Sequence, residues 1–182
     1  MSAHSKPNRT LSAPLRRAVF LDRDGVINED TGYPHKESGL IFCKGAPEAI
    51  SALSQAGFLI VVVTNQSGVG RGYFSLVELL AFHQHMNHRL ENEWRTRLDA
   101  IYFCPHLPDA GCLCRKPSAH MILSAAEDLG IALSSSYMVG DRDSDVTCGQ
   151  RAGVRTVGVS GVTHADHIAS DLSSAVPWIL SQ

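Results

Sequence analysis

Two aspartates, Asp22 and Asp24, come directly after a short apolar run at residues 18–21. Such a run predicts a buried strand, and residues two apart on an extended chain point to the same side. Both carboxylates can therefore face one site, where they repel each other unless one is protonated or a cation lies between them. The pair suits a hard metal ion such as Mg²⁺, with one acid placed to attack and the other to transfer a proton.

Three further polar clusters follow apolar runs later in the chain, at residues 64–68, 115–117 and 140–145. Parallel strands of an α/β sheet bring their carboxyl ends to the edge where ligands bind. The two aspartates alone could equally cap a loop. Four clusters in this order are hard to explain as caps, so we expect them to form one site.

The residue types in these clusters match the needs of phosphoryl transfer. A carboxylate can attack phosphorus, and a neighbouring acid can protonate the leaving oxygen and later deprotonate water. The transferred group carries charge on three oxygens, which a hydroxyl, backbone N–H groups and a lysine can stabilise. Mg²⁺ can be bound by the carboxylates of Asp22 and Asp141 and by the backbone carbonyl of Asp24.

A second set of ligand-type residues consists of Cys104, His106, Cys112 and Cys114. Three thiolates and one imidazole make a complete tetrahedral set for Zn²⁺, and a site filled by four protein ligands is structural rather than catalytic. A disulfide between the last two cysteines would close an unusually tight ring. We therefore predict a zinc-binding loop that stiffens the chain and fixes the two basic residues that follow it.

Alternating strand and helix patterns predict the elements that position these clusters. Strands are expected at 18–21, 58–63, 100–103, 137–139 and 156–159, and helices at 46–55, 75–94, 118–129, 145–152 and 175–180. This alternation predicts an α/β fold, a single Rossmann-like three-layer sandwich with a central parallel sheet. The connections are too short for a second domain or a large cap domain.

Length and composition agree with one globular domain. The chain has 182 residues, 44% hydrophobic content and a formal net charge of -2, so no basic surplus predicts a nucleic-acid partner. No apolar stretch approaches the roughly 20 residues that span a bilayer. Residues 1–17 are polar and mixed, and we expect a flexible tail without a secretory signal, followed by a cytoplasmic, monomeric domain at 18–182.

The four clusters, in this order, resemble the motifs of the haloacid dehalogenase superfamily of phosphatases, and the resemblance covers most of the predicted domain. It implies that Asp22 is the nucleophile and Asp24 the general acid/base. It also implies that Thr64 and Lys116 stabilise the phosphate and that Asp141 binds the metal. A second acid of the last cluster, the residue at position 145, would either reach the metal through water or orient the lysine.

The zinc loop narrows the resemblance to the heptose bisphosphate phosphatase family, which also shares the segments at residues 22–28, 32–33 and 71–72. This implies a Mg²⁺-dependent enzyme of lipopolysaccharide precursor synthesis that removes the 7-phosphate of a sugar bisphosphate through an aspartyl-phosphate intermediate. The substrate contacts expected from the resemblance and from the cationic positions are Asp30, Thr31, Gly32, Tyr33, Asn65, Gln66, Ser67, Arg71, Arg115 and Arg142. Histidinol-phosphate phosphatases share the zinc loop and are the nearest alternative. A phosphatase of another small phosphomonoester is a further alternative from the sequence.

Two alternatives come from other functional classes. A signalling receiver domain also phosphorylates an aspartate on a parallel sheet, but the zinc loop and the spacing of Asp22 and Asp24 disfavour it. A zinc-binding interaction module with a decayed catalytic site is disfavoured by the complete set of acids, threonine and lysine. His83, in the helix at 75–94, is predicted to pack in the core because no acid or cysteine completes a ligand set there.

Overall fold

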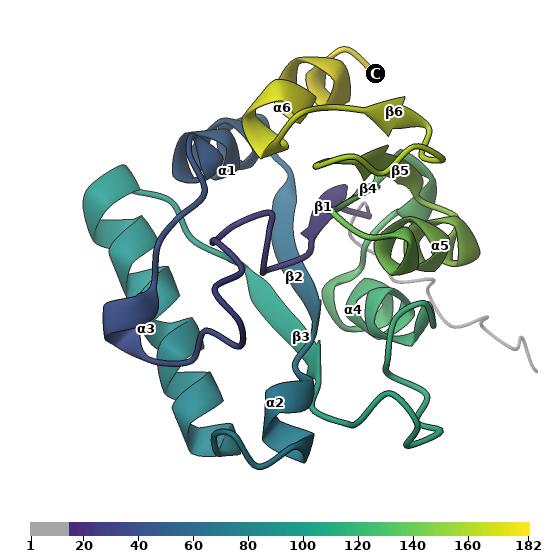
Figure 1. The fold of residues 1–182 in the computed structure, drawn as a ribbon. Coiled ribbons are helices and arrows are strands. Elements are labelled where there is room, and N and C mark those ends of the chain that lie inside the picture. Colours follow the sequence, from purple (N-terminus) through teal and green to yellow (C-terminus); the bar gives the residue numbers. More distant parts are fainter. Residues whose placement is uncertain (1–14) are drawn as a thin grey trace, which may run out of the picture.

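The structure is a computed structural model that describes residues 15–182. Its first strand, β1 (Ala18–Leu21), lies inside an all-parallel sheet. The other strands are β2 (Leu59–Asn65), β3 (Ala100–Cys104), β4 (Tyr137–Gly140), β5 (Arg155–Gly158) and β6 (His167–Ile168). Their order in the six-stranded sheet is β3-β2-β1-β4-β5-β6 (Figure 1). Inner strands of a parallel sheet are buried on both faces, which explains the unbroken apolar runs of β1 and of β2 through Val63.

Helices cover both faces of this sheet. They are α1 (Ala46–Gln55), α2 (Ser67–Gly70), α3 (Leu76–Trp94), α4 (His120–Leu129), α5 (Asp143–Ala152) and α6 (Leu172–Leu180), with 3-10 turns η1 (Glu37–Gly39) and η2 (Leu133–Ser135). α1, α3 and α6 pack on the face that carries Val19 and Leu21, whereas α4 and α5 pack on the face that carries Ala18 and Phe20 (Figure 1). The chain is therefore a three-layer sandwich in a single α/β domain, as the sequence predicts.

The strand β2 is longer than predicted. Its parallel pairing with β3 continues through Thr64, opposite Phe103, and Asn65, opposite Cys104. The apolar run ends at Val63, but backbone pairing does not require apolar side chains, so the strand extends into the polar cluster. Thr64 and Asn65 consequently sit on a rigid strand end rather than in a loop.

Other differences from the predicted elements are local. The edge strand β6 and the helical turn α2 were not predicted, since two and four residues are too few to show a periodic pattern. The helix expected to start at Ser118 begins at His120 with Ala119 at the N-cap position. The last helix begins earlier than predicted, because the Asp171 side chain caps it by accepting the N–H of Ser174.

The predicted flexible tail at 1–17 lies outside the described residues except for its last three positions. Of these, Arg16 pairs with Ile131 in a parallel bridge, and the Arg17 guanidinium lies 4.0 Å from the centre of the Phe58 ring. Within residues 15–182, no helix combines the length and the apolar character that a membrane crossing requires.

We expect Phe20→Ala to lower the free energy of unfolding by roughly 3–5 kcal/mol, because it opens a cavity at a fully buried position of the central strand. Val77→Ala on α3 provides the control, since that side chain is 75% exposed and its loss should change stability by no more than about 0.5 kcal/mol. Urea denaturation monitored by circular dichroism measures both. Similar losses for the two variants would contradict this assignment of the core.

Candidate active site

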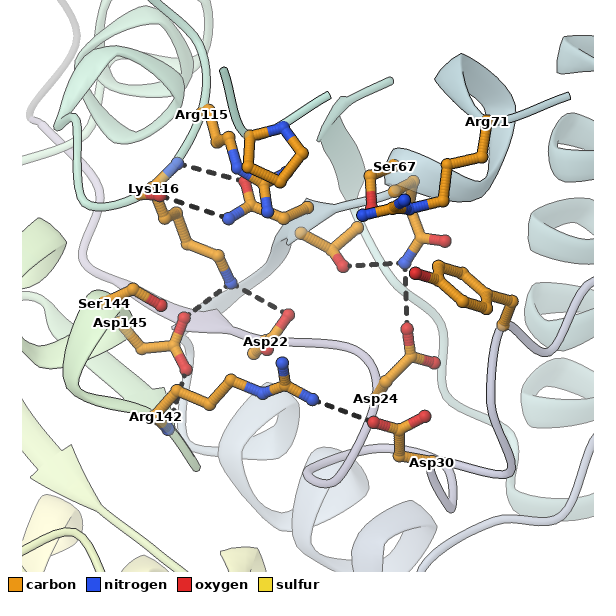
Figure 2. A pocket seen from close by; sticks show the side chains of 15 residues that line it. Asp22, Asp24, Asp30, Ser67, Arg71, Arg115, Lys116, Arg142, Ser144 and Asp145 are labelled. Carbon is orange, nitrogen blue, oxygen red and sulfur yellow. Dashed lines mark hydrogen bonds and ion pairs between the residues drawn. The ribbon is translucent and has the colours of Figure 1, made fainter. Parts of the chain in front are cut away.

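The four predicted catalytic residues line one pocket at the carboxyl-terminal edge of the sheet (Figure 2). Asp22 and Asp24 follow β1, Thr64 lies at the end of β2, and Lys116 comes from the loop after β3. The predicted substrate contacts that share this lining are Asp30, Tyr33, Asn65, Gln66, Ser67, Arg71, Arg115 and Arg142. The strand order thus brings together residues as far apart in the chain as Asp22 and Arg142.

Lys116 is the cation at the centre of this pocket. Its side chain is buried, and its Nζ atom lies 2.9 Å from Asp22 Oδ1 and 2.6 Å from Asp145 Oδ1. The ammonium group also donates to the carbonyl of Val63, at 2.8 Å. Burial alone would lower the pKa of Lys116, but the two carboxylates outweigh it and hold the pKa above its ordinary value. The lysine is therefore charged, and the contact of Asp145 with it favours an orienting role for that acid.

Three carboxylates crowd the same corner of the site. One oxygen each of Asp22, Asp141 and Asp145 lies within 4.8 Å of the others. Burial and the charge of Asp22 raise the pKa of Asp145 to about 6, against the opposing effect of Lys116, and burial with Asp22 also raises the pKa of Asp141. The protein cations here are the Lys116 ammonium group and the Arg142 guanidinium, whose Nε lies 3.9 Å from Asp141 Oδ1. Two cations do not balance three carboxylates, so this corner favours a further cation.

The chemistry of this corner fits Mg²⁺. Asp141 Oδ1 is buried and has no hydrogen-bond partner among residues 15–182, as expected for an oxygen that serves a metal. Gly25 leaves the space for this carboxylate: a Cβ atom there would lie 2.3 Å from Asp141 Oδ2, and its φ of +84° is also unfavourable for other residues. Asp22 and Asp141 are thus suited to hold the ion, as the sequence predicts.

Asp24 is held by four N–H donors, two of them from a residue that sequence reasoning had not singled out. Arg23 donates from Nε to Oδ1 at 3.0 Å and from Nη2 to Oδ2 at 2.9 Å. The side-chain amides of Asn28 and Gln66 donate to Oδ1 and Oδ2, each at 2.9 Å. With two donors on each oxygen, the orientation of the Asp24 side chain is fixed.

Arg23 and Asn28 carried little signal in the sequence. On an extended strand Arg23 should point away from its neighbours, and the alternation rule assigns it to the opposite face. Its burial is the relevant clue, because a fully buried guanidinium needs an acidic partner nearby. Burial is a property of the folded chain, so the sequence alone could not show it.

Two predicted substrate contacts hold catalytic residues in place. The Asn65 amide accepts the backbone N–H of Lys116 at 3.0 Å and donates to the backbone carbonyl of the same residue at 3.2 Å. The Gln66 amide donates to Thr64 Oγ1 at 3.0 Å as well as to Asp24. These contacts lock the end of β2 to the lysine loop and to the second aspartate, while direct substrate contact by either amide stays a prediction.

The pocket mouth carries three arginines. Arg142 pairs with Asp30 at 2.8 Å and so links the loop after β4 to the loop after β1 (Figure 2). Arg115 donates to the carbonyl of His106 at 3.4 Å. Arg71, just after α2, completes the cationic rim. These side chains give the mouth a positive potential suited to a phosphorylated substrate.

Two predicted contacts in the loop after β1 lie outside the pocket lining. Thr31 and Gly32 are exposed, and Gly32 turns the chain with a φ of +80°. The turn brings Tyr33 back to the pocket, where its ring meets the ring of Tyr73 edge to face at 5.1 Å between centroids. Substrate contact by Thr31 and Gly32 therefore stays a prediction.

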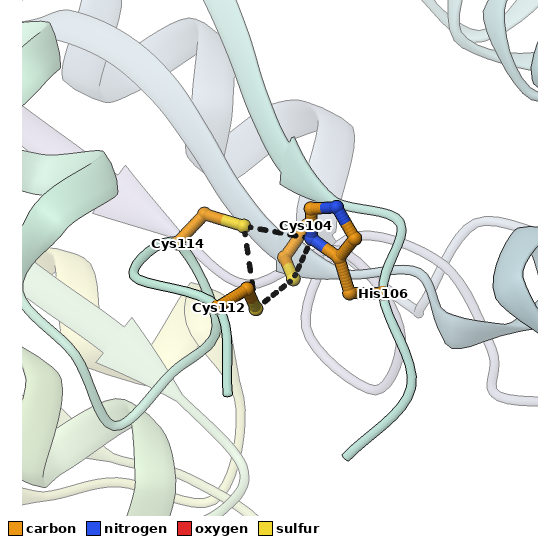
Figure 3. A group of neighbouring side chains, drawn as sticks. All are labelled: Cys104, His106, Cys112 and Cys114. Atoms are coloured by element: carbon orange, nitrogen blue, oxygen red, sulfur yellow. Dashed lines mark hydrogen bonds between the residues drawn. The ribbon is translucent and has the colours of Figure 1, made fainter. Parts of the chain in front are cut away.

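The predicted zinc ligands converge beside this pocket (Figure 3). The Sγ atoms of Cys104 and Cys112 lie 3.5 Å apart, and those of Cys112 and Cys114 lie 3.6 Å apart. His106 Nδ1 faces the same centre, 3.2 Å from Cys114 Sγ and 3.6 Å from Cys104 Sγ. All three cysteines are free of disulfides. The four atoms form a compact group, all within 4.8 Å of one another, and their chemistry fits the tetrahedral coordination of Zn²⁺.

This cluster is fastened to the active site by backbone bonds. Gln66 N–H donates to the carbonyl of Cys104 at 2.7 Å, and Gly70 N–H donates to the carbonyl of Pro105 at 3.0 Å. A Cβ atom at Gly70 would lie 2.8 Å from that Pro105 oxygen, so the close approach requires glycine. These bonds fix the cysteine loop against the segment that contains Gln66 and Arg71, so an ordered loop also orders that segment.

Comparison with known proteins identifies the family. A family model described as HAD-hydrolase-like matches residues 113–178. A D-glycero-beta-D-manno-heptose-1,7-bisphosphate 7-phosphatase of Haemophilus ducreyi is 38% identical over 179 residues, which cover 90% of this chain and 98% of that protein. The Escherichia coli phosphatase of the same name is 39% identical over 171 residues, covering 90% of this chain and 88% of the relative.

A solved structure agrees with these relatives. The D,D-heptose 1,7-bisphosphate phosphatase from B. bronchiseptica, in complex with magnesium and phosphate, superposes with a TM-score of 0.83 at 32% identity, over 91% of this chain and 98% of the other. Both the sequence relatives and this structure match nearly the whole domain and not an isolated motif. The chain therefore belongs to the haloacid dehalogenase superfamily and, within it, to the family of the heptose-1,7-bisphosphate 7-phosphatases.

Proposed function

We propose that residues 18–182 form a Mg²⁺-dependent phosphatase domain that removes the 7-phosphate of D-glycero-D-manno-heptose 1,7-bisphosphate, in bacterial lipopolysaccharide precursor synthesis. The observation that carries the proposal is the pocket that combines Asp22, Asp24, Thr64 and Lys116 under a rim of arginines. The choice of substrate follows the names of the relatives, which match nearly the whole domain. We also propose that the enzyme is cytoplasmic and monomeric. Its net charge of -2 leaves no basic surplus for binding nucleic acid.

The first step is attack by Asp22 on the phosphorus atom. Asp22 Oδ1 accepts the N–H of Arg23 at 2.7 Å and lies against the Lys116 ammonium group. Within residues 15–182 both contacts fall on Oδ1, so Oδ2 is the oxygen placed to attack. The new bond joins Oδ2 to phosphorus while the ester P–O bond breaks, and Asp24 in its acid form protonates the leaving sugar oxygen.

The second step regenerates the enzyme. Asp24, now a carboxylate, takes a proton from water as that water attacks the phosphorus of the aspartyl phosphate. The bond from phosphorus to Asp22 breaks, which releases inorganic phosphate and the free carboxylate. The four donors on Asp24 hold its side chain in position for this step. Thr64 and Lys116 stabilise the charge on the phosphoryl oxygens in both steps.

Mg²⁺ would be held by Asp22, Asp141 and the backbone carbonyl of Asp24, and when bound it would neutralise charge on the phosphoryl oxygens. Zn²⁺ would be held by the cysteine loop in a structural role. The segregation of oxygen ligands in one corner and sulfur ligands in another supports two ions with separate roles.

We expect phosphate release to be fastest on the heptose 1,7-bisphosphate when kcat/KM is measured against histidinol phosphate and common sugar monophosphates. Asp22→Asn should keep the circular dichroism spectrum and abolish turnover on every substrate, because the amide cannot form the aspartyl phosphate. A higher kcat/KM for histidinol phosphate would show that the heptose bisphosphate is not the preferred substrate. More than a small residual rate for Asp22→Asn would remove the nucleophile assignment.

Zinc content provides a test of the cysteine loop. Protein purified without added metal should contain about one zinc per chain by elemental analysis. Cys114→Ser should lower that content and the melting temperature, because it removes one of four ligands. Cys43→Ser should keep the zinc, since that thiol lies outside the cluster. Metal-free wild-type protein, or zinc loss in both variants, would contradict a zinc site at these four residues.

Arg115→Ala is expected to lower kcat/KM for the bisphosphate by a factor that corresponds to roughly 1–3 kcal/mol, the range for losing a charge-assisted hydrogen bond. A generic phosphomonoester should lose less, because it lacks the distal phosphate. Arg97→Ala is the matched control, since this exposed arginine precedes β3 at the opposite edge of the sheet. An equal fall in kcat/KM for both substrates would mean that Arg115 contacts the transferred phosphoryl group and not the distal phosphate.

A further inference from the structure

A buried histidine lies behind the aspartate that the proposed mechanism uses as acid and base. His83, on α3, is 4% exposed, and its Nε2 atom lies 3.1 Å from Nη1 of Arg23, which is 0% exposed. Arg23 in turn donates hydrogen bonds to both carboxylate oxygens of Asp24. The three side chains form a line from the helix layer to the pocket.

The direction of the histidine contact follows from chemistry. A guanidinium group has only donors, so Nε2 of His83 accepts and its proton is on Nδ1. Burial, together with the positive charge of Arg23, lowers the pKa of His83 to about 3, so the ring is neutral near pH 7. The acceptor is therefore available throughout the neutral range.

The other histidine nitrogen shows that packing alone does not explain this residue. Nδ1 of His83 is buried without a hydrogen-bond partner among residues 15–182. An unpaired buried donor is unfavourable, and an apolar side chain of similar size would avoid it. The other ring nitrogen, Nε2, faces Arg23. The hydrogen bond to Arg23 is therefore the polar contact that distinguishes His83 from an apolar residue at this position.

Arg23 depends on its surroundings to keep its orientation. Its Nη2 atom also donates to the carbonyl of Pro34 at 3.0 Å, and its charge lies 4.8 Å from the centre of the Phe82 ring. His83 accepts from Nη1, whereas the Asp24 carboxylate accepts from Nε and Nη2. With acceptors on both sides, the guanidinium plane is fixed and its fork faces Asp24.

We propose that His83 is a positioning residue for the reaction, which acts through Arg23 to keep Asp24 aligned as the base that deprotonates water in the hydrolysis of the aspartyl phosphate. This inference rests on the proposed phosphatase function. It assigns His83 no contact with substrate. Removing the acceptor leaves the guanidinium free to turn, and small displacements of a catalytic group have large effects on rate.

The two chemical steps respond differently to such a change. With 4-nitrophenyl phosphate the leaving group needs little protonation, so kcat/KM reports phosphorylation of Asp22 without strong dependence on Asp24. Hydrolysis of the phosphoenzyme still requires the base. Pulse–chase with acid quench measures that hydrolysis rate directly. A purely structural role for His83 would not separate the two quantities.

His83→Met removes the acceptor in an apolar side chain of similar length. It should slow phosphoenzyme hydrolysis roughly tenfold or more and leave kcat/KM for 4-nitrophenyl phosphate within about twofold. His83→Gln can place an amide oxygen near the Nε2 position and should restore hydrolysis to within about threefold of wild type. His83→Asn, whose shorter amide does not reach that position, should behave like the methionine variant and serves if the latter does not fold.

Leu90→Ala provides the control, because it opens a cavity in the same helix away from Arg23. It should lower the melting temperature and leave the ratio of the two rates unchanged. An equal fall of both rates in His83→Met, no fall in either, or no recovery in His83→Gln would overturn the proposal. Absence of phosphate release by the wild type would instead overturn the proposed function, so the two failures are distinct.

Discussion

The buried ammonium group of Lys116 is the interaction on which the rest of the site depends. It joins Asp22, which directly follows β1, to Asp145, in the first turn of α5, and its third bond reaches the backbone of β2. A buried carboxylate without a partner is strongly unfavourable, so the lysine and the two acids must be brought together by the same fold. This charge group explains why the loop after β3 has to be held firmly, and the Asn65 amide and the cysteine loop hold it.

The sheet supplies this arrangement through its strand order. β1 lies between β2 and β4, so the chain leaves β1 toward one side of the sheet and later returns to its other side. The carboxyl end of β1 is consequently flanked by two strands whose following loops diverge, which is where parallel α/β sheets bind ligands. Asp22 stands at this point, with Thr64 on one side and Asp141 on the other. Glycine at position 25 then allows the chain to turn beneath the Asp141 carboxylate.

Polar side chains around the pocket divide into those that face a ligand and those that hold their neighbours. The amides of Asn28, Asn65 and Gln66 bond to Asp24, Thr64 or the Lys116 backbone. The arginines at positions 71 and 115 line the pocket, and we propose that they bind phosphate oxygens. A site of this kind can be rigid at the reacting atoms and open at the rim, and selectivity then comes from charged contacts at the mouth rather than from a closing lid.

By itself, the sequence determined the class of fold, and it predicted the catalytic edge and the two ligand sets. Apolar runs and helical periods identify the five longer strands, and acids, threonine and lysine at their ends identify the site because parallel strands end at one edge. Only the tertiary structure decided what the long polar side chains do. Alternation assigns a side chain to a face but does not select its partner, so the burial of Arg23 against Asp24 and His83 could not be predicted. The same reason applies to Asn65 and Gln66, whose amides could reach either substrate or protein, and the choice is made by where β2 and the lysine loop meet in space.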